Sequence, residues 1–207
     1  MDPTTFISKL DAHNGLAPLN KFMARISFPS KLMTGTAGSV ATEISYFCDS
    51  APMPGKTIAT SELRHYGPTR KMAREATFAE FQLGFIMTNS HAARNTFLEW
   101  MDFIIDPVTA NIRYQNEYKG TIKVFMFDQS AVSTSPDNAT LGAEYQQAFP
   151  TNVDPVALGW DQLNQVGKFS VNFQYKRWVP IQGMGHSNPN ARQANLGGET
   201  GDEGSSF

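Results

Sequence analysis

Hydrophobic and polar residues alternate over several short stretches of the chain, and a period of two is typical of a β-strand with one buried face. The alternation is clearest in 167–178, where Phe169, Val171, Phe173 and Tyr175 are separated by polar residues. Strands are also predicted at 20–28, 42–50, 77–89 and 121–128, with a shorter one near 144–149. The chain is therefore expected to be mainly β.

Two segments have the spacing of an α-helix instead. Residues 90–106 repeat apolar side chains every three or four positions, with Ser90 as a suitable N-cap and Asp106-Pro107 as the stop. The apolar stripe of this helix consists of Phe97, Trp100, Met101 and Ile104. A shorter amphipathic helix is predicted over 2–12, with an apolar side made of Phe6, Ile7 and Leu10.

Two further segments lack either periodicity. Prolines and glycines interrupt a run of mixed charge in 51–76, which is predicted to be a long loop, and such loops are usually functional or disordered. Residues 179–207 are rich in Gly, Asn, Gln and Ser, and they cannot bury enough apolar surface to offset the entropy of ordering. We therefore expect a β domain over 1–178 and a flexible C-terminal extension over 179–207.

The overall composition limits the class of protein. A hydrophobic share of 41% against 17% charged residues is that of a folded domain, and a formal net charge of −2 gives no basic field for wrapping nucleic acid. Cys48 is the only cysteine, so an intramolecular disulfide is excluded. No secretory signal pattern and no apolar run near the roughly 20 residues of a membrane span occurs. We expect a soluble protein that folds in a reducing cytoplasm.

Few residues suggest catalytic or metal chemistry. The four histidines, at positions 13, 65, 91 and 186, lack the spacing of a zinc site, and Cys48 lies within a predicted strand. Neither a nucleophile elbow nor a phosphate-binding loop is present in the sequence. We therefore expect no cofactor, no metal and no enzymatic activity. The alternative from a different class is a β-barrel ligand-binding protein or enzyme that uses the cleft beside the helix.

The order of these elements resembles the tail tube proteins of contractile-tailed bacteriophages. The resemblance runs from the strand "EISYFCDS", through "APMPGKTI…YGPTRKMAREATFAEFQLGF", to the helix "SHAARNTFLEWMDFI". The segments "FPTNV", "LGWD" and "FSVNFQYKRW" fit the end of the same pattern, so that the resemblance covers about residues 20–178. The tube protein of type VI secretion systems shares this architecture.

The resemblance implies a β-barrel or sandwich with one flanking helix, assembling into hexameric rings that stack into a hollow tube. The chain would then be a structural virion protein, assembled in the host cytoplasm, and its tube would conduct DNA without sequence-specific binding. Its partners would be its own copies, the tail sheath, the baseplate and the tape-measure protein. A specialised ring that joins baseplate and tube is the alternative, because 29–41, 128–142 and 179–207 are longer than a minimal tube subunit needs.

The resemblance also assigns roles to particular residues. The segment 51–76 would reach a neighbouring subunit or ring, and an ordinary exposed loop is the alternative. Its interface candidates are Lys56, Glu62, Arg64, Arg70, Lys71, Arg74 and Glu75. The proline-containing stretch 148–162 is interpreted as a strand end followed by a connector into the closing strand. The expected structural anchors of the core or of a subunit seam are Phe97, Trp100, Trp160, Phe169 and Phe173.

Overall fold

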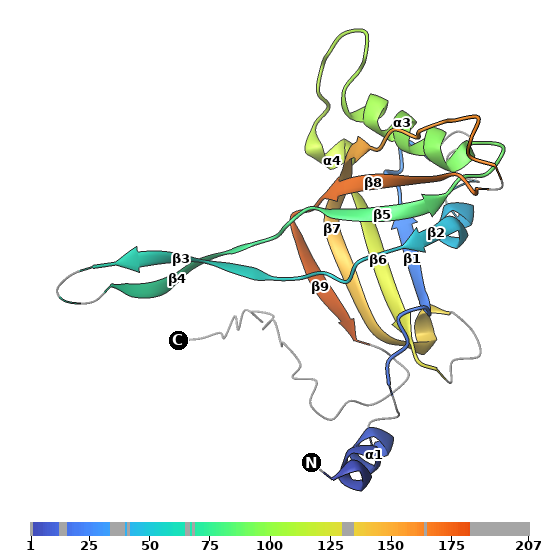
Figure 1. The fold of residues 1–207 in the computed structure, drawn as a ribbon. Coiled ribbons are helices and arrows are strands. Elements are labelled where there is room, and N and C mark those ends of the chain that lie inside the picture. Colours follow the sequence, from blue (N-terminus) through green and yellow to red (C-terminus); the bar gives the residue numbers. More distant parts are fainter. Residues whose placement is uncertain are drawn as a thin grey trace, which may run out of the picture.

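Two antiparallel sheets, joined by one long strand, form the body of the molecule in a computed structural model (Figure 1). The structure describes residues 2–12, 16–33, 40, 42–64, 67, 69–129, 135–163 and 165–182. Within these ranges the fold is mainly β with a nearly closed, barrel-like sheet, and this confirms the predicted class.

The strands lie in the order β1 (Phe22–Ser27), β6 (Gly120–Phe127), β7 (Ala139–Val153), β8 (Lys168–Gln174), β5 (Phe81–Ile86) and β2 (Cys48–Ser50). The first sheet contains β1, β6 and the start of β7, and the second contains the end of β7, β8, β5 and β2. Strand β9 (Arg177–Gln182) pairs with β7 on the side opposite β6 and so extends the first sheet. A separate pair consists of β3 (Thr57–Leu63) and β4 (Arg70–Thr77). The helices are α1 (Pro3–Ala12), α3 (Ala92–Ile104) and α4 (Gln115–Tyr118), and short 3-10 turns occupy Ser45–Phe47 and Pro136–Asn138.

Strand β7 belongs to both sheets because it bends at Gln147. Its register with β6 passes from Gln146 directly to Ala148, so Gln147 has no partner there and takes a left-handed φ of 57°. Such a bulge bends a strand and increases its twist. Before the bulge β7 pairs with β6 and β9, and from Phe149 onward it pairs with β8.

The core fills the space between the two sheets and α3. Phe97 and Trp100 of α3 are fully buried, and their rings contact Phe173 of β8 at centroid distances of 5.9 and 6.2 Å. The Trp100 indole donates its hydrogen to the carbonyl oxygen of Tyr118, 2.9 Å away, so its one polar group is satisfied. Phe169 is also buried and stacks on Phe85.

The helix α3 lies within the predicted range 90–106, but its N-cap was predicted wrongly. His91, rather than Ser90, occupies the N-cap position with a left-handed φ of 53° and no side-chain cap. The Ser90 hydroxyl instead lies 3.0 Å from the hydroxyl of Thr88, and the His91 N–H donates to the Thr88 carbonyl. This turn delays the start of the helix beyond Ser90.

The predicted strand 42–50 is also wrong over most of its length. Residues 42–44 are helical, a 3-10 turn follows, and only Cys48–Ser50 forms a strand. Val40 and Ile44 are both buried, and a spacing of four places them on one side of a helical turn. Tyr46, which alternation would place beside Ile44, is 79% exposed.

The predicted closing strand 167–178 is divided into β8 and β9. The chain turns at Tyr175 and Lys176, and the Lys176 N–H donates to the Gln146 carbonyl beside the β7 bulge, 3.1 Å away. Strand β9 continues to Gln182, so the ordered sheet extends past the predicted domain boundary after Trp178. The remainder of the predicted extension, 183–207, lies outside the described residues.

The stretch 148–162 is partly strand and partly connector. Pro150 was predicted to end a strand, but it lies within β7 opposite Phe173, at a register irregularity that tolerates its missing N–H. The connector therefore begins after Val153. Trp160 was expected to anchor the core or a subunit seam, yet within this chain it is completely exposed and takes no part in the core.

Candidate assembly surface

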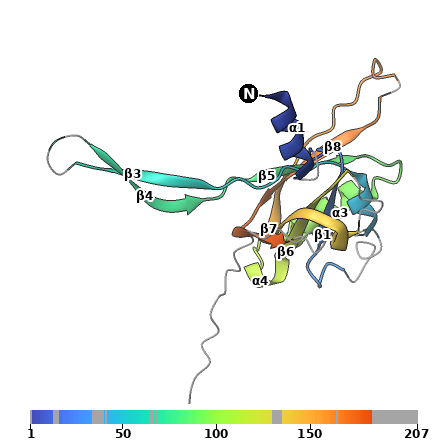
Figure 2. The same ribbon diagram turned by 90° about the horizontal axis from the view of Figure 1, so that it is seen from below.

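The segment predicted to be a loop at 51–76 is a long β-hairpin that projects from the body, which corrects the prediction. Figures 1 and 2 show β3 and β4 extending together away from both sheets. Their antiparallel register runs from Thr57 opposite Thr77 to Leu63 opposite Arg70, with a bulge between Ala59 and Thr60. The hairpin is therefore a hydrogen-bonded arm.

Neither face of this arm is covered by the part of the chain that the structure describes. No residue of β3 or β4 is buried, and the apolar side chains of Ile58, Leu63 and Met72 are each more than half exposed. A two-stranded hairpin alone is at best marginally stable in water. Such an arm is expected to gain stability when another surface covers it.

All seven predicted interface candidates belong to the arm or its start. Lys56 directly precedes β3 and Arg64 directly follows it, while the others lie within the two strands. Glu62 stands opposite Lys71, but among the described residues none of the seven forms an ion pair. Five basic and two acidic groups give the arm a formal charge of +3, which leaves −5 on the rest of the −2 chain.

Hydrogen bonds from two aromatic side chains of the first sheet fix the start of the arm. The Tyr145 hydroxyl donates to the Pro52 carbonyl at 2.9 Å, and the Trp178 indole donates to the Gly55 carbonyl at 3.1 Å. Both acceptors lie in the segment that leads into β3. The arm therefore begins from a fixed point on β7 and β9.

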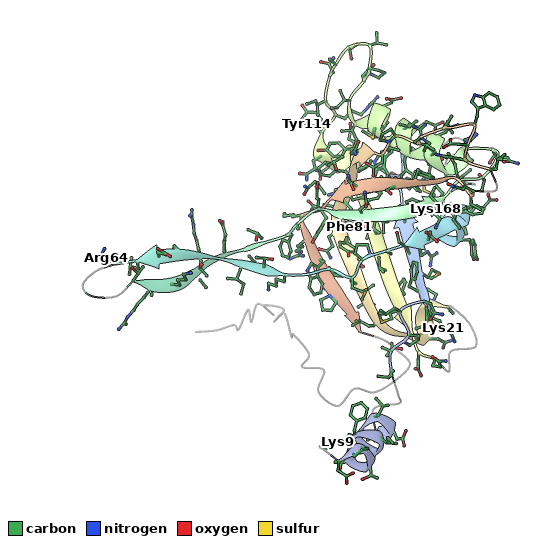
Figure 3. The ribbon with its side chains drawn as sticks, in the orientation of Figure 1. Lys9, Lys21, Arg64, Phe81, Tyr114 and Lys168 are labelled. Atoms are coloured by element: carbon green, nitrogen blue, oxygen red, sulfur yellow. The ribbon has the colours of Figure 1, made fainter. Side chains whose placement is uncertain are left out.

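An aromatic cluster holds the other side of the base. The ring of Phe78, just after β4, contacts Tyr175 at 5.9 Å, and Tyr175 meets Tyr145 edge-on at 4.9 Å. Phe81 stacks on Tyr145 with a centroid distance of 4.0 Å. Burial raises the pKa of the Tyr145 and Tyr175 hydroxyls, so both remain protonated and able to donate hydrogen bonds. Figure 3 labels Phe81 at this junction of arm and body.

An open groove of about 610 Å³ lies at the same base. Its walls include the segment from Ser50 to Gly55 on one side and Phe81, Tyr145 and Tyr175 on the other. Its position beside the arm makes it part of the same surface.

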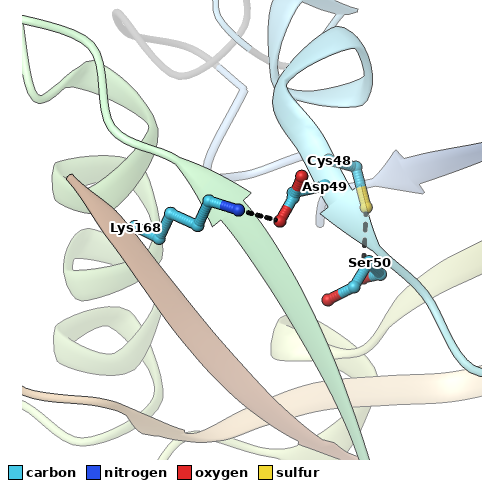
Figure 4. Close-up of polar contacts among 4 residues, drawn as sticks. All are labelled: Cys48, Asp49, Ser50 and Lys168. Carbon is cyan, nitrogen blue, oxygen red and sulfur yellow. Dashed lines mark hydrogen bonds and ion pairs between the residues drawn. The ribbon is translucent and has the colours of Figure 1, made fainter. Parts of the chain in front are cut away.

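The edge strand β2, which leads to the arm, is tied to β8 by an ion pair. The Lys168 ammonium lies 2.8 Å from a carboxylate oxygen of Asp49 (Figure 4). The neighbouring Cys48 thiol lies 3.6 Å from the Ser50 carbonyl, and burial raises its pKa to about 12. Because the thiolate is the reactive form, this cysteine is chemically inert at neutral pH.

No other feature of the described residues indicates a chemical site. Within them, no group of three or more His, Cys, Asp or Glu side chains is placed to hold a metal ion. The helices in the described part of the chain are all too short or too polar to cross a membrane.

Comparison with known proteins agrees with this architecture. The model of the family described as phage tail tube protein matches residues 17–180, which is most of the chain. The chain belongs to this phage tail tube family. It is therefore a structural subunit of a tail tube, and the projecting arm, the groove at its base and every strand up to β8 lie within the matched region. A search of curated proteins finds no match.

Solved structures of contractile injection systems share the fold of this tail tube protein. A chain of the sheath/tube terminator of an extracellular contractile injection system (PVC) in its extended state matches with a TM-score of 0.55 at 13% identity, covering 80% of this chain and 96% of that one. A chain of the PVC sheath-tube complex matches with a TM-score of 0.52 at 13% identity, covering 84% of this chain and 97% of that one. A chain of the anti-feeding prophage baseplate matches with a TM-score of 0.53 at 12% identity, covering 82% of this chain and 97% of that one.

Sequence reasoning located the charged residues of the tail tube arm but missed the residues that fix its base. Tyr145, Tyr175, Trp178 and Phe78 were not singled out, because each acts through a contact with a segment far away in the sequence. Of the five predicted anchors, Phe97, Trp100, Phe169 and Phe173 lie in the core, and Trp160 does not.

Proposed function

We propose that this tail tube protein assembles into hexameric rings, that the rings stack into the tube of a contractile tail, and that the β3–β4 arm makes the contact with a neighbouring subunit or ring. The observation that carries the proposal is an arm with no buried residue of its own that is fixed firmly at its base. Fixing the base sets the direction of the arm, and a preorganised arm loses less entropy on docking.

Charge supports contact between copies of the same chain. The +3 arm faces away from a remainder that carries −5, so the arm of one copy is attracted to the body of the next. Because the arm is exposed, salt will screen this attraction over about 8–10 Å at physiological ionic strength. The individual contacts are proposed to include the seven charged candidates, among them Arg70 and Lys71.

In the proposed assembly the tube is part of the virion and conducts DNA without reading its sequence. Sheath and baseplate are the proposed external partners, since the structures that share this fold come from sheath-tube and baseplate assemblies. A tape-measure protein inside the tube and assembly in the host cytoplasm complete the proposal. The proposed role is structural, with no enzymatic step.

Replacement of the arm tests the proposal. A variant in which 57–77 is replaced by a short Gly-Ser turn keeps Gly55 and Phe78 and should fold, because the removed strands contribute no buried residue. Negative-stain electron microscopy of the unaltered protein should show rings and tubes, and the variant should show neither. Tubes of unchanged length from the variant would refute the role of the arm.

Charge reversal provides a milder test with a matched control. Arg70→Glu should raise the protein concentration needed for tubes, and the defect should respond to salt. Lys119→Glu is the control, because this lysine lies outside the arm and contacts only the Asn116 side chain through its ammonium. Equal effects of both changes would show that the arm has no special part.

A specialised ring between baseplate and tube is the second candidate. It is favoured by the match to a chain of the anti-feeding prophage baseplate, whose TM-score equals those of the tube chains to within a few hundredths. Counting copies in purified virions by quantitative mass spectrometry separates the two. An adaptor is present in six to a dozen copies by symmetry, and a repeating tube subunit in many more.

A further inference from the structure

The N-terminal helix α1 presents an apolar stripe that no other described part of the chain covers. Phe6 and Ile7 are 55% and 56% exposed, and no residue of α1 is buried. Among the described residues no hydrogen bond, ion pair or ring contact joins α1 to the body. Figures 1 and 3 show α1, marked by Lys9, standing apart from the sheets beyond Lys21.

A helix of this length needs a partner. It has 10 residues, and isolated helices shorter than about 12–15 residues are marginal in water. Its stripe of Phe6, Ile7 and Leu10 follows the spacing by which an amphipathic helix binds in a groove. The helix also precedes residues 17–180 that match the family model, so it is an addition to the matched tube domain.

A groove of suitable character runs along the free edge of β1. It encloses about 470 Å³, and its lining includes Met23, Arg25, Met33, Tyr46 and Pro136. Met33 is 43% exposed and Tyr46 is 79% exposed, so the groove has apolar surface that a docking segment could cover. Strand β1 pairs only with β6, which leaves this side of the sheet open within the described chain.

The charges of helix and groove are complementary. The side chain of Arg25 in the groove forms no hydrogen bond or ion pair with any other described residue. On α1, Asp11 follows Ile7 by four positions and flanks one edge of the apolar stripe, while Lys9 follows Phe6 by three positions and flanks the other edge. Docking that buries the stripe therefore brings Asp11 toward the basic wall of the groove.

We propose that α1 of one copy docks by its Phe6–Ile7–Leu10 stripe into the β1-edge groove of a second copy, with Asp11 near Arg25. The occupant is a second copy because every copy in a ring carries both helix and groove, and such head-to-tail contacts close rings or extend stacks. Figure 1 shows the chain's own α1 apart from β1. This inference rests on the proposed ring assembly.

Cysteine cross-linking between separately prepared variants tests the contact. Ile7→Cys and Met33→Cys are each made with Cys48→Ala, mixed before assembly, and oxidised with copper phenanthroline. A disulfide between the two variants is then necessarily between copies, and we expect a covalent dimer on a non-reducing gel. Ser8→Cys mixed with Met33→Cys is the matched control and should give several-fold less dimer, because Ser8 lies on the side of α1 opposite the stripe.

The outcomes separate this inference from the proposed function. Rings or tubes seen by electron microscopy without the Ile7–Met33 dimer would overturn the helix docking and leave the tube role standing. A double variant, Ile7→Cys with Met33→Cys in one chain, that cross-links only within itself would also overturn it. Absence of any rings in the unaltered protein would count against the proposed function itself.

Removing 2–12 should raise the concentration needed for assembly by about tenfold or more, since three apolar side chains lose their contact.

Discussion

The hydroxyl of Tyr145 donates a hydrogen bond to the carbonyl oxygen of Pro52 across 2.9 Å, which connects the long strand β7 to the start of the projecting arm. Tyr145→Phe removes this bond but keeps the stacking on Phe81. Leaving the Pro52 carbonyl without its donor should cost about 1 kcal/mol in the free energy of unfolding. Urea denaturation measures the loss, and Tyr114→Phe, at an 84% exposed position, is the control.

The raised pKa of the same hydroxyl predicts that the free energy of unfolding decreases at alkaline pH. Burial raises the pKa of Tyr145 above its ordinary value of 10.0, so above pH 10 the unfolded chain releases a proton that the folded chain retains. The stabilising contribution is therefore complete below pH 10 and decreases as pH rises, by up to about 1.4 kcal/mol per pH unit for one group. Denaturation between pH 9 and 11 should show this decline, and Tyr145→Phe should flatten it. An identical slope in the variant would contradict the assignment.

Gly120 is predicted to tolerate no side chain. A Cβ there would lie 2.7 Å from both the Ser27 carbonyl oxygen and the Trp100 ring, and both groups are held in place by the sheet and the core. Gly120→Ala should lower the free energy of unfolding by about 1–3 kcal/mol, as overpacking does. Gly55→Ala is the matched control, since its Cβ would meet nothing within 4 Å. Thermal melting followed by circular dichroism compares the two.

Strand β9 predicts different effects of two truncations. Ending the chain after Trp178 removes the residues that pair with Leu141–Glu144, as well as the contact of Ile181 with the outer cluster around Phe125. The midpoint of thermal unfolding should fall by about 5–10 °C, from a loss of a few kcal/mol. Ending the chain after Gln182 keeps this pairing and should change the midpoint little. Equal midpoints would mean that β9 adds no stability.

Cys48 provides a direct probe of unfolding. Its thiol pKa of about 12 leaves almost no thiolate at pH 8, so the native protein should react slowly with a thiol reagent such as Ellman's reagent. In urea the thiol regains its ordinary pKa and should react at the rate of a free cysteine. Fast reaction of the native protein would show that β2 opens readily.

The strands that the sequence predicts well are those with one face in the core. Phe81, Leu83 and Phe85 alternate in β5 because only one side of that strand is buried. The arm could not be predicted in this way because neither of its faces is buried, and its strands therefore show no alternation. Pro54 and Gly67 favoured the prediction of a loop instead. Periodicity detects burial within one chain, and the proposed burial of the arm occurs against another copy.

The remaining differences arise from tertiary contacts. Alternation at Ile44, Tyr46 and Cys48 imitates a strand, whereas the burial of Val40 with Ile44 favours a helical turn. Tyr145 and Trp178 at the base of the arm could not be assigned because their partners are backbone carbonyls about a hundred residues away, and Phe78 and Tyr175 because each contacts the ring of the other. Only the fold reveals such pairs.

The bulge at Gln147 gives one strand hydrogen-bonded partners in both sheets. Strand β7 pairs with β6, β8 and β9, and its Tyr145 also holds the Pro52 carbonyl at the start of the arm. A change in the position of the arm at this hydrogen bond would therefore act on three neighbouring strands through a single strand.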